Sequence, residues 1–216
     1  MSIDIIKQPI SKEFEAFEKI FSDSVKTKVP LINHITRYIL KTRGKQMRPL
    51  FVLLSAQLYG EVPESALRGA TMIELLHTAT LVHDDVVDDA VLRRGAFSIK
   101  SLWQNKIAVL VGDYILSRGM LLAVENKDFN LLEIVSRATR EMSEGELLQI
   151  EKARRPKVDE DLYFEIIRKK TASLIASCFA SGAASAGANK EEIERMYQAG
   201  EDVGIAFQIK DDIMDF

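Results

Sequence analysis

The chain has 216 residues, of which 47% are hydrophobic and 28% charged, a composition typical of one globular domain that folds around its own core. Its formal net charge of −3 at pH 7 argues against a nucleic-acid-binding protein, whose binding surface would be strongly basic. The single cysteine, Cys178, excludes an internal disulfide and cysteine-based zinc ligation, and it suits a reducing cytosol.

Nearly every segment has the apolar spacing of a helix, and none shows the alternation of a convincing strand. Apolar residues from Phe14 to Phe21 predict the first helix, and prolines near the starts of the next three are typical of a first helical turn. A loop is predicted at Arg93–Gly95. Further helices are expected at Leu31–Lys41, from Pro49 to Gly60, from Pro63 to about Asp88–Asp89, at Lys106–Val124 and at Phe129–Ala153.

The C-terminal part of the chain predicts two more helices. Asp159 fits the N-cap of a helix that runs through Lys170 into Thr171–Ala188, which we take as the most apolar stretch. Its serines and glycines favour a buried helix over a membrane span. Asn189 and Glu192 form a capping-box pattern at the start of the last helix.

Both ends of the chain carry information. The first residues lack the basic start and apolar segment of a signal peptide, so we expect a cytoplasmic protein that does not span a membrane. The last helix ends on three carboxylates, which oppose the dipole at a helix C-terminus. We therefore expect residues 1–216 to be a single helical domain, truncated just after these carboxylates, with its C-terminal helices missing.

Two five-residue stretches share one acidic pattern. The first, DDVVD, spans Asp84–Asp88 and is followed by Asp89; the second, DDIMD, spans Asp211–Asp215. On a helix, positions i, i+1 and i+4 lie within about one turn, so each motif presents its carboxylates as one cluster. Two unit charges about 4 Å apart repel each other by on the order of 4 kcal/mol at an effective dielectric of 20. Clusters set in apolar helices therefore require a compensating cation.

The ligand type indicates which cation. Carboxylate oxygens without cysteine favour a hard ion, Mg²⁺ or Mn²⁺, which commonly shares its coordination shell with substrate phosphates. One such motif alone would as readily be a solvated acidic face. Two copies with identical spacing on apolar helices favour a functional site.

Basic residues provide candidate anion contacts. The stretch Gly44–Pro49, GKQMRP, joins a turn to a helix start, where Lys45 and Arg48 could reach one phosphate group. Arg93 and Arg94 follow the first acidic motif, and Lys170 and Thr171 lie late on another helix. Each of these charges alone is more often a solvated surface charge.

The histidines raise one alternative. Glu74 and His77 form an ExxH pattern of the kind found in di-iron helical bundles. Such a site needs a second ExxH, which neither His34 nor His83 provides, because Leu31 and Thr80 stand at the positions three before them. The di-iron interpretation is therefore weak.

Taken in order, the motifs GKQMRP, ELLHTATLVHDDVVDDAVLRRG, EGELLQ, KKTASL and GIAFQIKDDIMDF resemble the trans-isoprenyl diphosphate synthases, or polyprenyl synthetases. They run from Gly44 to Phe216 in the family's order. The resemblance implies an all-α isoprenoid synthase fold, in which stacked antiparallel helices surround a central active-site cavity, and a homodimer. It also implies a Mg²⁺-dependent head-to-tail condensation of isopentenyl diphosphate with an allylic diphosphate.

The resemblance also assigns roles to residues. The metal ligands would be Asp84, Asp85, Asp88, Asp211, Asp212 and Asp215. The allylic diphosphate would contact Arg93, Lys170 and Gln208, and the diphosphate of isopentenyl diphosphate would contact Lys45, Arg48, His77 and Arg94. Thr171 would stabilise the developing allylic cation. The residues expected to carry the catalysis are Asp84, Asp85, Asp88, Lys170, Thr171 and Asp211.

Product length is expected to depend on the helix before the first acidic motif. Ala79 stands five residues before Asp84, about 7.5 Å deeper along that helix. In the family an aromatic residue there blocks the growing chain. Ala79, followed by Thr80, resembles the open tunnel of a long-chain synthase, octaprenyl or similar, although Leu76 one turn further could set a limit.

Other classes of protein stay open. A class I terpene cyclase shares the fold, but it has no use for the GKQMRP site and usually lacks a second DDxxD. A regulatory subunit of a heteromeric synthase, a short-chain farnesyl or geranylgeranyl synthase and a structural helical protein are further alternatives. The final chain length and the allylic primer stay undetermined, and we expect these 216 residues alone to be poorly active.

Overall fold

The computed structural model describes residues 3–42, 44–152 and 160–214, which are almost entirely helical. The predicted all-α class is confirmed. In chain order the helical elements are α1 (Ile3–Lys7), η1 (Gln8–Ile10), α2 (Ser11–Ser24), α3 (Pro30–Lys41), α4 (Met47–Gln57), α5 (Glu64–Val87), α6 (Ile99–Glu125), α7 (Phe129–Lys152), α8 (Glu160–Ile167), η2 (Arg168–Ala172), α9 (Ser173–Ser185) and α10 (Lys190–Met214).

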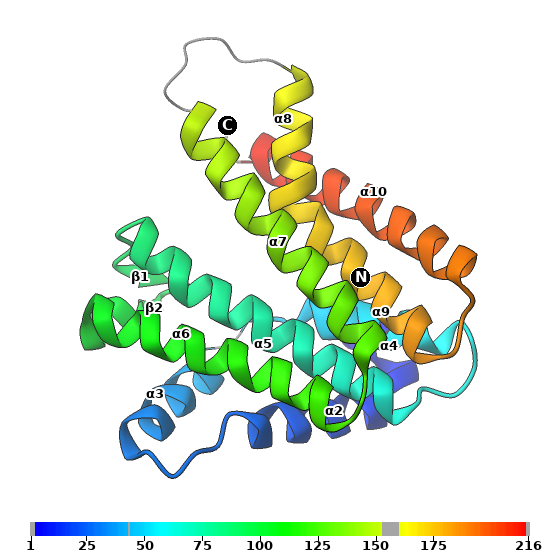
Figure 1. Cartoon of the computed structure of the whole chain (residues 1–216), viewed down its shortest axis with the longest axis horizontal. Coiled ribbons are helices and arrows are strands. Elements are labelled where there is room, and N and C mark those ends of the chain that lie inside the picture. The colour runs from blue at the N-terminus through cyan, green and yellow to red at the C-terminus, as the bar shows by residue number, and fades with distance from the viewer. Residues whose placement is uncertain (1–2, 43, 153–159, 215–216) are drawn as a thin grey trace.

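The long helices pack in two groups. Figure 1 shows α5 and α6 side by side, with α7 inclined to both and α10 running along α9. Helix α9 also packs against α4, α5 and α7, and α2 packs against α5. As a result, the C-terminal end of α5, the η2 turn and the middle of α7 surround one region of the molecule.

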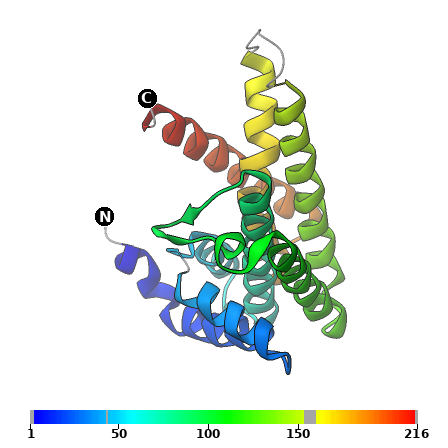
Figure 2. The ribbon, with the colours of Figure 1, turned by 90° about the vertical axis from the view of Figure 1, so that its left-hand side faces the viewer.

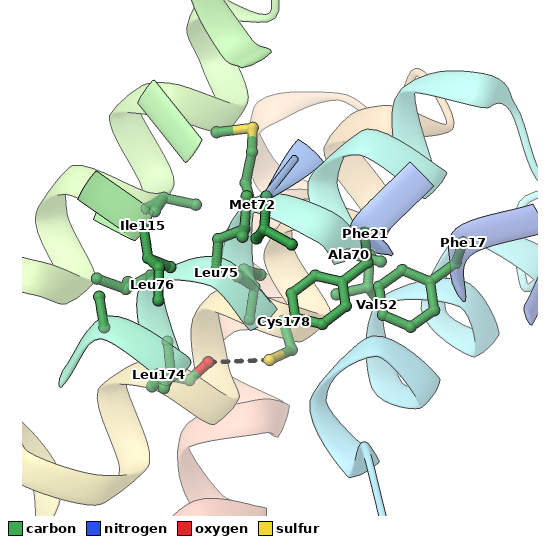
Figure 3. Close-up of a cluster of buried hydrophobic side chains, with 14 of the residues drawn as sticks. Phe17, Phe21, Val52, Ala70, Met72, Leu75, Leu76, Ile115, Leu174 and Cys178 are labelled. Atoms are coloured by element: carbon green, nitrogen blue, oxygen red, sulfur yellow. Dashed lines mark hydrogen bonds between the residues drawn. The ribbon is translucent and has the colours of Figure 1, made fainter. Parts of the chain in front are cut away.

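The hydrophobic core lies between α2, α4, α5, α6 and α9. Figure 3 shows the rings of Phe17 and Phe21 packed near Leu75 and Cys178, all at most 2% exposed. Burying one large apolar side chain contributes about 1.5–3 kcal/mol to stability. Burial raises the pKa of the Cys178 thiol to about 12, and the thiol donates to the Leu174 carbonyl at 3.1 Å. Cys178 is therefore a structural residue.

The segment after α5 differs from the prediction in two places. Residues 92–97 form a small antiparallel hairpin, β1 (Leu92–Arg93) and β2 (Ala96–Phe97), where only a loop was expected. Its two turn residues have positive φ, +54° at Arg94 and +76° at Gly95, which suits a tight two-residue hairpin turn. Helix α6 starts with a short segment at Ile99 that was not predicted, which the Ser98 hydroxyl caps by accepting from the Ser101 amide at 3.2 Å. The non-helical Gln104 separates this segment from the helix predicted from Lys106.

Helix α6 carries the largest set of exposed apolar side chains. Within the described ranges it is the one helix long and apolar enough, by length and composition, to cross a membrane, and 33% of that apolar stretch is buried. Thr171–Ala188, taken above as the most apolar stretch, is instead divided between η2 and the short helix α9. The α6 apolar face consists of Leu102, Val109, Leu110, Met120, Leu121 and Val124.

Candidate active site

The first acidic motif forms the C-terminal end of α5. Asp84 and Asp85 lie on its last turn, and Asp88 follows as the C-cap, with its amide donating to the Asp84 carbonyl at 2.8 Å. Burial raises the pKa of Asp84, and the nearby carboxylate of Glu146 adds to that effect. This carboxylate is therefore costly to keep ionised without a compensating positive charge.

The hairpin β1–β2 brings an arginine to this motif. Asp85 is only 2% exposed, and it accepts a hydrogen bond from Arg93 Nε at 2.5 Å. The hairpin projects beside the end of α5 in Figure 2, which explains why residues eight positions apart can meet. One predicted diphosphate contact and one predicted metal ligand thus lie against each other.

A cavity of about 470 Å³ opens beside Asp84. Predicted site residues from three further places in the sequence also line it: Arg48 of α4, His77 of α5, and Lys170 with Thr171 of η2. Helix α7 supplies the remaining wall through residues that include Met142, Ser143, Glu146, Leu147 and Ile150. The fold therefore gathers the predicted site around one space.

The wide η2 turn places Lys170. This turn is a π-helix, a form often found as a single turn at functional sites. Lys170 Nζ lies 2.5 Å from Glu146 Oε2 and 3.1 Å from Gln149 Oε1, both on α7. Gly145 allows this approach, because a Cβ atom there would lie 2.8 Å from the Lys170 backbone nitrogen. The EGELLQ motif, matched above without a role, thus holds Lys170.

A second basic group surrounds the start of α4. Arg48 Nη1 lies 2.9 Å from His77 Nε2, and because a guanidinium only donates, this histidine nitrogen accepts. Burial, followed by the charges of Arg48 and Arg94, holds the pKa of His77 well below its usual value, so its ring is neutral. Arg94 packs on the backbone of Gly44, and Lys45 is exposed on the adjoining turn.

This basic group has unused hydrogen-bond donors. Among the described residues, Gln46 Nε2 and Arg48 Nε are buried without a hydrogen-bond partner. A smaller cavity of about 60 Å³ is lined by His77, Arg93 and Arg94 among other residues. Unpaired buried donors beside several cations are what an anionic ligand would satisfy.

The second acidic motif lies at the end of α10. Asp211 is exposed and Asp212 is half-buried, while Asp215 lies outside the described residues. Asp212 Oδ1 accepts from Gln208 Nε2 at 2.8 Å, and Gln208 Oε1 accepts from the Thr171 hydroxyl at 2.8 Å. The predicted residues Thr171, Gln208 and Asp212 are therefore linked in one hydrogen-bonded chain.

The donors fit a hard divalent cation, since all the acidic candidates offer carboxylate oxygens. In residues 3–42, 44–152 and 160–214, no three His, Cys, Asp or Glu side chains lie close enough together to form a preassembled metal site. The carboxylates of Asp88 and Asp211 are exposed. A cation would therefore have to draw these side chains together.

A second, apolar cavity of about 310 Å³ lies between α5, α6 and α7. Leu76 lines it, Thr80 lines the first cavity one turn away, and Ser143 lines both. Ala79, in contrast, is 1% exposed and belongs to the hydrophobic core. Ala79 and Thr80 were predicted to control product length, and of these two residues Thr80 lines a cavity. Their effect on product length stays a prediction.

Three site residues were not predicted. Glu146 and Gln149 contact Lys170, and Tyr163 of α8 donates to Asp212 Oδ2 at 2.5 Å. The EGELLQ motif was a usable signal for the first two. No sequence signal marked Tyr163.

An aspartate motif, a part-buried arginine–histidine pair and a lysine around one cavity in stacked helices define an isoprenoid synthase fold. The sequence pattern of the family described as "Polyprenyl synthetase" matches residues 29–216. The chain therefore belongs to the polyprenyl synthetase family.

Among curated relatives, the chain is 39% identical over 220 residues to the all-trans-nonaprenyl-diphosphate synthase (geranyl-diphosphate specific) of Rhodobacter capsulatus, covering all of this chain and 67% of that protein. It is 37% identical over 207 residues to heptaprenyl diphosphate synthase component 2 of Geobacillus stearothermophilus, covering 96% of this chain and 65% of that protein. The chain thus spans about two thirds of the length of these relatives.

Solved structures agree on the fold. A decaprenyl diphosphate synthase from Rhodobacter capsulatus superposes with a TM-score of 0.94 at 34% identity, over 99% of this chain and 66% of that one. A polyprenyl synthase from Caulobacter crescentus, complexed with calcium and isoprenyl diphosphate, superposes with a TM-score of 0.93 at 34% identity, over 99% of this chain and 65% of that one. A geranylgeranyl pyrophosphate synthase from Bacteroides thetaiotaomicron superposes with a TM-score of 0.82 at 40% identity, over 100% of this chain and 66% of that one.

Proposed function

We propose that the full-length protein is a trans-prenyltransferase that condenses isopentenyl diphosphate with an allylic diphosphate into a long-chain polyprenyl diphosphate. One observation carries this proposal: a cavity with the charged residues Asp84 and Lys170 at its wall lies next to an apolar cavity lined by Leu76. Helix α5 and Ser143 line both cavities. This arrangement suits a substrate with a charged head and a growing hydrocarbon tail.

The charges around the first cavity support ionisation of the allylic substrate. Lys170 and Arg93 would bind its diphosphate, so that the C–O bond breaks with both electrons leaving on the diphosphate. The double bond of isopentenyl diphosphate then attacks the cation, which forms the new C–C bond and leaves a new carbocation. The released diphosphate takes up a proton from the carbon next to that cationic centre, and the C–H electrons form the double bond of the product. Mg²⁺, when bound, neutralises charge on the diphosphate; the residues that would hold it are Asp84, Asp85, Asp88, Asp211 and Asp212.

The second basic group would hold the other substrate. Arg48 Nε is a buried donor without a partner, and the neutral His77 keeps the Arg48 guanidinium in place through its Nε2 atom. Arg94 and the exposed Lys45 add charge at the same turn. Keeping the two diphosphates at separate groups orients the reacting carbons and excludes water from the cation.

The test uses the full-length protein with Mg²⁺, farnesyl diphosphate and radiolabelled isopentenyl diphosphate, and it sizes the products by chromatography. We expect a ladder that ends near eight isoprene units. Products that stop at three or four units would keep the prenyltransferase activity and contradict the long-chain assignment. No incorporation at all would contradict the proposal.

A heteromeric enzyme is the second candidate, because one relative is named as component 2 of a heptaprenyl diphosphate synthase. In that case the chain would carry both acidic motifs yet need a second component. Incorporation that appears only after a partner component is added would favour this candidate. Incorporation by the purified protein alone would exclude it.

We further propose that a second copy of the chain covers the α6 apolar face. Its six large side chains are 40–55% exposed, a larger number of exposed large apolar side chains than any other single helix has within the described residues. Leu121→Glu should convert a homodimer into monomers in light scattering, while the control Leu58→Glu, on the 75% exposed Leu58 of another surface, should not.

The α6 apolar face is also relevant to the cellular location of the protein. We propose that the protein is cytoplasmic and that α6 does not span a membrane, because α6 packs along α5 within the bundle. Cell fractionation should recover the protein in the soluble extract. Recovery in the membrane fraction would favour α6 as a membrane segment instead.

A further inference from the structure

Tyr163 connects α8 to the second acidic motif. Its hydroxyl donates to Asp212 Oδ2 at 2.5 Å, across 49 positions in the sequence. The ring is half-buried and packs edge-on against Phe164, with 5.5 Å between the ring centroids. The phenol is therefore held in one place by its ring while its hydroxyl engages the carboxylate.

Both oxygens of the Asp212 carboxylate are held. Tyr163 donates to Oδ2, and Gln208 Nε2 donates to Oδ1 at 2.8 Å. Gln208 is in turn oriented by the Thr171 hydroxyl at 2.8 Å. The donors come from two different elements, α8 and α10, so rotation of the carboxylate would break at least one hydrogen bond.

The Asp212 carboxylate has more acceptor sites than its two hydrogen bonds use. An ionised carboxylate has about four lone-pair sites, and here two of them accept hydrogen bonds. The remaining sites are free to bind a cation in a fixed direction. Carboxylates that ligate metals are commonly oriented in this way by neighbouring donors.

We propose that Tyr163 is a positioning residue that orients Asp212, and through it the second acidic motif, for binding the divalent cation and the diphosphate. This inference rests on the proposed function for the identity of the ligand. Tyr163 acts through Asp212 and does not itself touch the substrate. The role differs from that of Gln208, which lies on the same helix as Asp212 and joins α10 to η2 through Thr171, whereas Tyr163 joins Asp212 directly to α8.

The chain offers a matched control. Tyr197 also donates its hydroxyl to a carboxylate, Glu141 Oε2 at 3.0 Å, and this hydrogen bond also joins α10 to another helix, α7. Glu141 is outside the proposed site. Tyr197→Phe therefore removes the same chemical group and a similar interhelical hydrogen bond, without altering either acidic motif.

The experiment compares full-length wild-type protein, Tyr163→Phe and Tyr197→Phe. Manganese binding in the presence of inorganic diphosphate is measured from the loss of the free Mn²⁺ paramagnetic resonance signal, and thermal unfolding is recorded for each protein. We expect Tyr163→Phe to weaken manganese binding by about 10-fold or more. Tyr197→Phe should stay within about 2-fold of wild type, even if both variants unfold at lower temperature.

The outcomes separate the inference from the proposed function. Equal manganese affinity of Tyr163→Phe and wild type, or no manganese binding by wild type, would overturn the positioning role. An equal loss in both variants would also overturn it, because the effect would then be one of general stability. Wild-type protein that binds manganese and diphosphate tightly but forms no prenyl product would refute the proposed function and leave the role of Tyr163 standing.

Discussion

Gly145 offers the sharpest test of how α7 and η2 fit together. A Cβ atom at this position would lie 2.8 Å from the Lys170 backbone nitrogen and 2.9 Å from Lys169 Cβ. Both distances are several tenths of an ångström below ordinary van der Waals contact, and the first involves backbone that cannot rotate away. Gly145→Ala must therefore push α7 and η2 apart.

Two effects oppose each other in this substitution. Alanine in a helix interior is favoured over glycine by about 1 kcal/mol, whereas overpacking a close contact costs about 1–3 kcal/mol. We expect Gly145→Ala to lower the stability by up to about 2 kcal/mol, which corresponds to up to about 4–8 °C for a chain of this size. Displacement of Lys170 should also slow prenyl transfer.

The matched control is Gly69→Ala in the interior of α5. Its new Cβ atom would meet only Leu131 Cδ1 at 3.4 Å and Ser185 Oγ at 3.5 Å, both side-chain atoms at ordinary contact distance. It should therefore be as stable as wild type or up to about 1 kcal/mol more stable. Thermal unfolding followed by circular dichroism measures the stability of both variants. A Gly145→Ala protein that melts at or above the temperature of Gly69→Ala would refute the close packing of α7 on η2.

Asp84→Asn should raise the unfolding temperature at pH 7, because the raised pKa of Asp84 means that its ionised form destabilises the fold. This gain in stability should vanish at low pH, where the carboxyl group is protonated. Prenyl transfer by the variant should fall by about 10²-fold. His77 has a lowered pKa, so below about pH 6.5 the unfolded chain binds a proton that the folded protein does not. Stability should therefore fall as the pH drops from 6.5 to 5, and chemical denaturation of His77→Gln should show a slope shallower by up to about 1.4 kcal/mol per pH unit. Leu76→Phe fills part of the 310 Å³ cavity and should shorten the products on chromatography, whereas an unchanged ladder would place the limit elsewhere.

Helix boundaries were predictable where a local signal sets them. The capping box at Asn189 and Glu192 is present with both of its hydrogen bonds, at 2.9 and 3.0 Å. The predicted start at Lys106 follows the break in α6 at Gln104, which has a positive φ of +71°, and only the short segment from Ile99 before this break was missed. The hairpin was missed because strands of two residues are too short to show alternation.

The site was predictable only in part, for a related reason. Asp84, Asp85 and Asp88 share one helix end, so their spacing alone places them together. The hydrogen bond from Tyr163 to Asp212 depends on how α8 packs against α10, and the sequence around Tyr163 does not indicate this packing. The pairing of Lys170 with Glu146 depends in the same way on the approach of α7.

The π-helical turn at Arg168–Ala172 makes the length of this segment matter more than its composition. A π turn is closed by i→i+5 hydrogen bonds and so holds one residue more than an α turn. Deleting one residue here would restore an ordinary α turn and leave α8 and α9 in nearly the same relative orientation, so Tyr163 would still face α10 and α9 would stay packed on α4. The deletion would instead displace Lys170 and Thr171 from the cavity wall, and it would thus separate folding from activity.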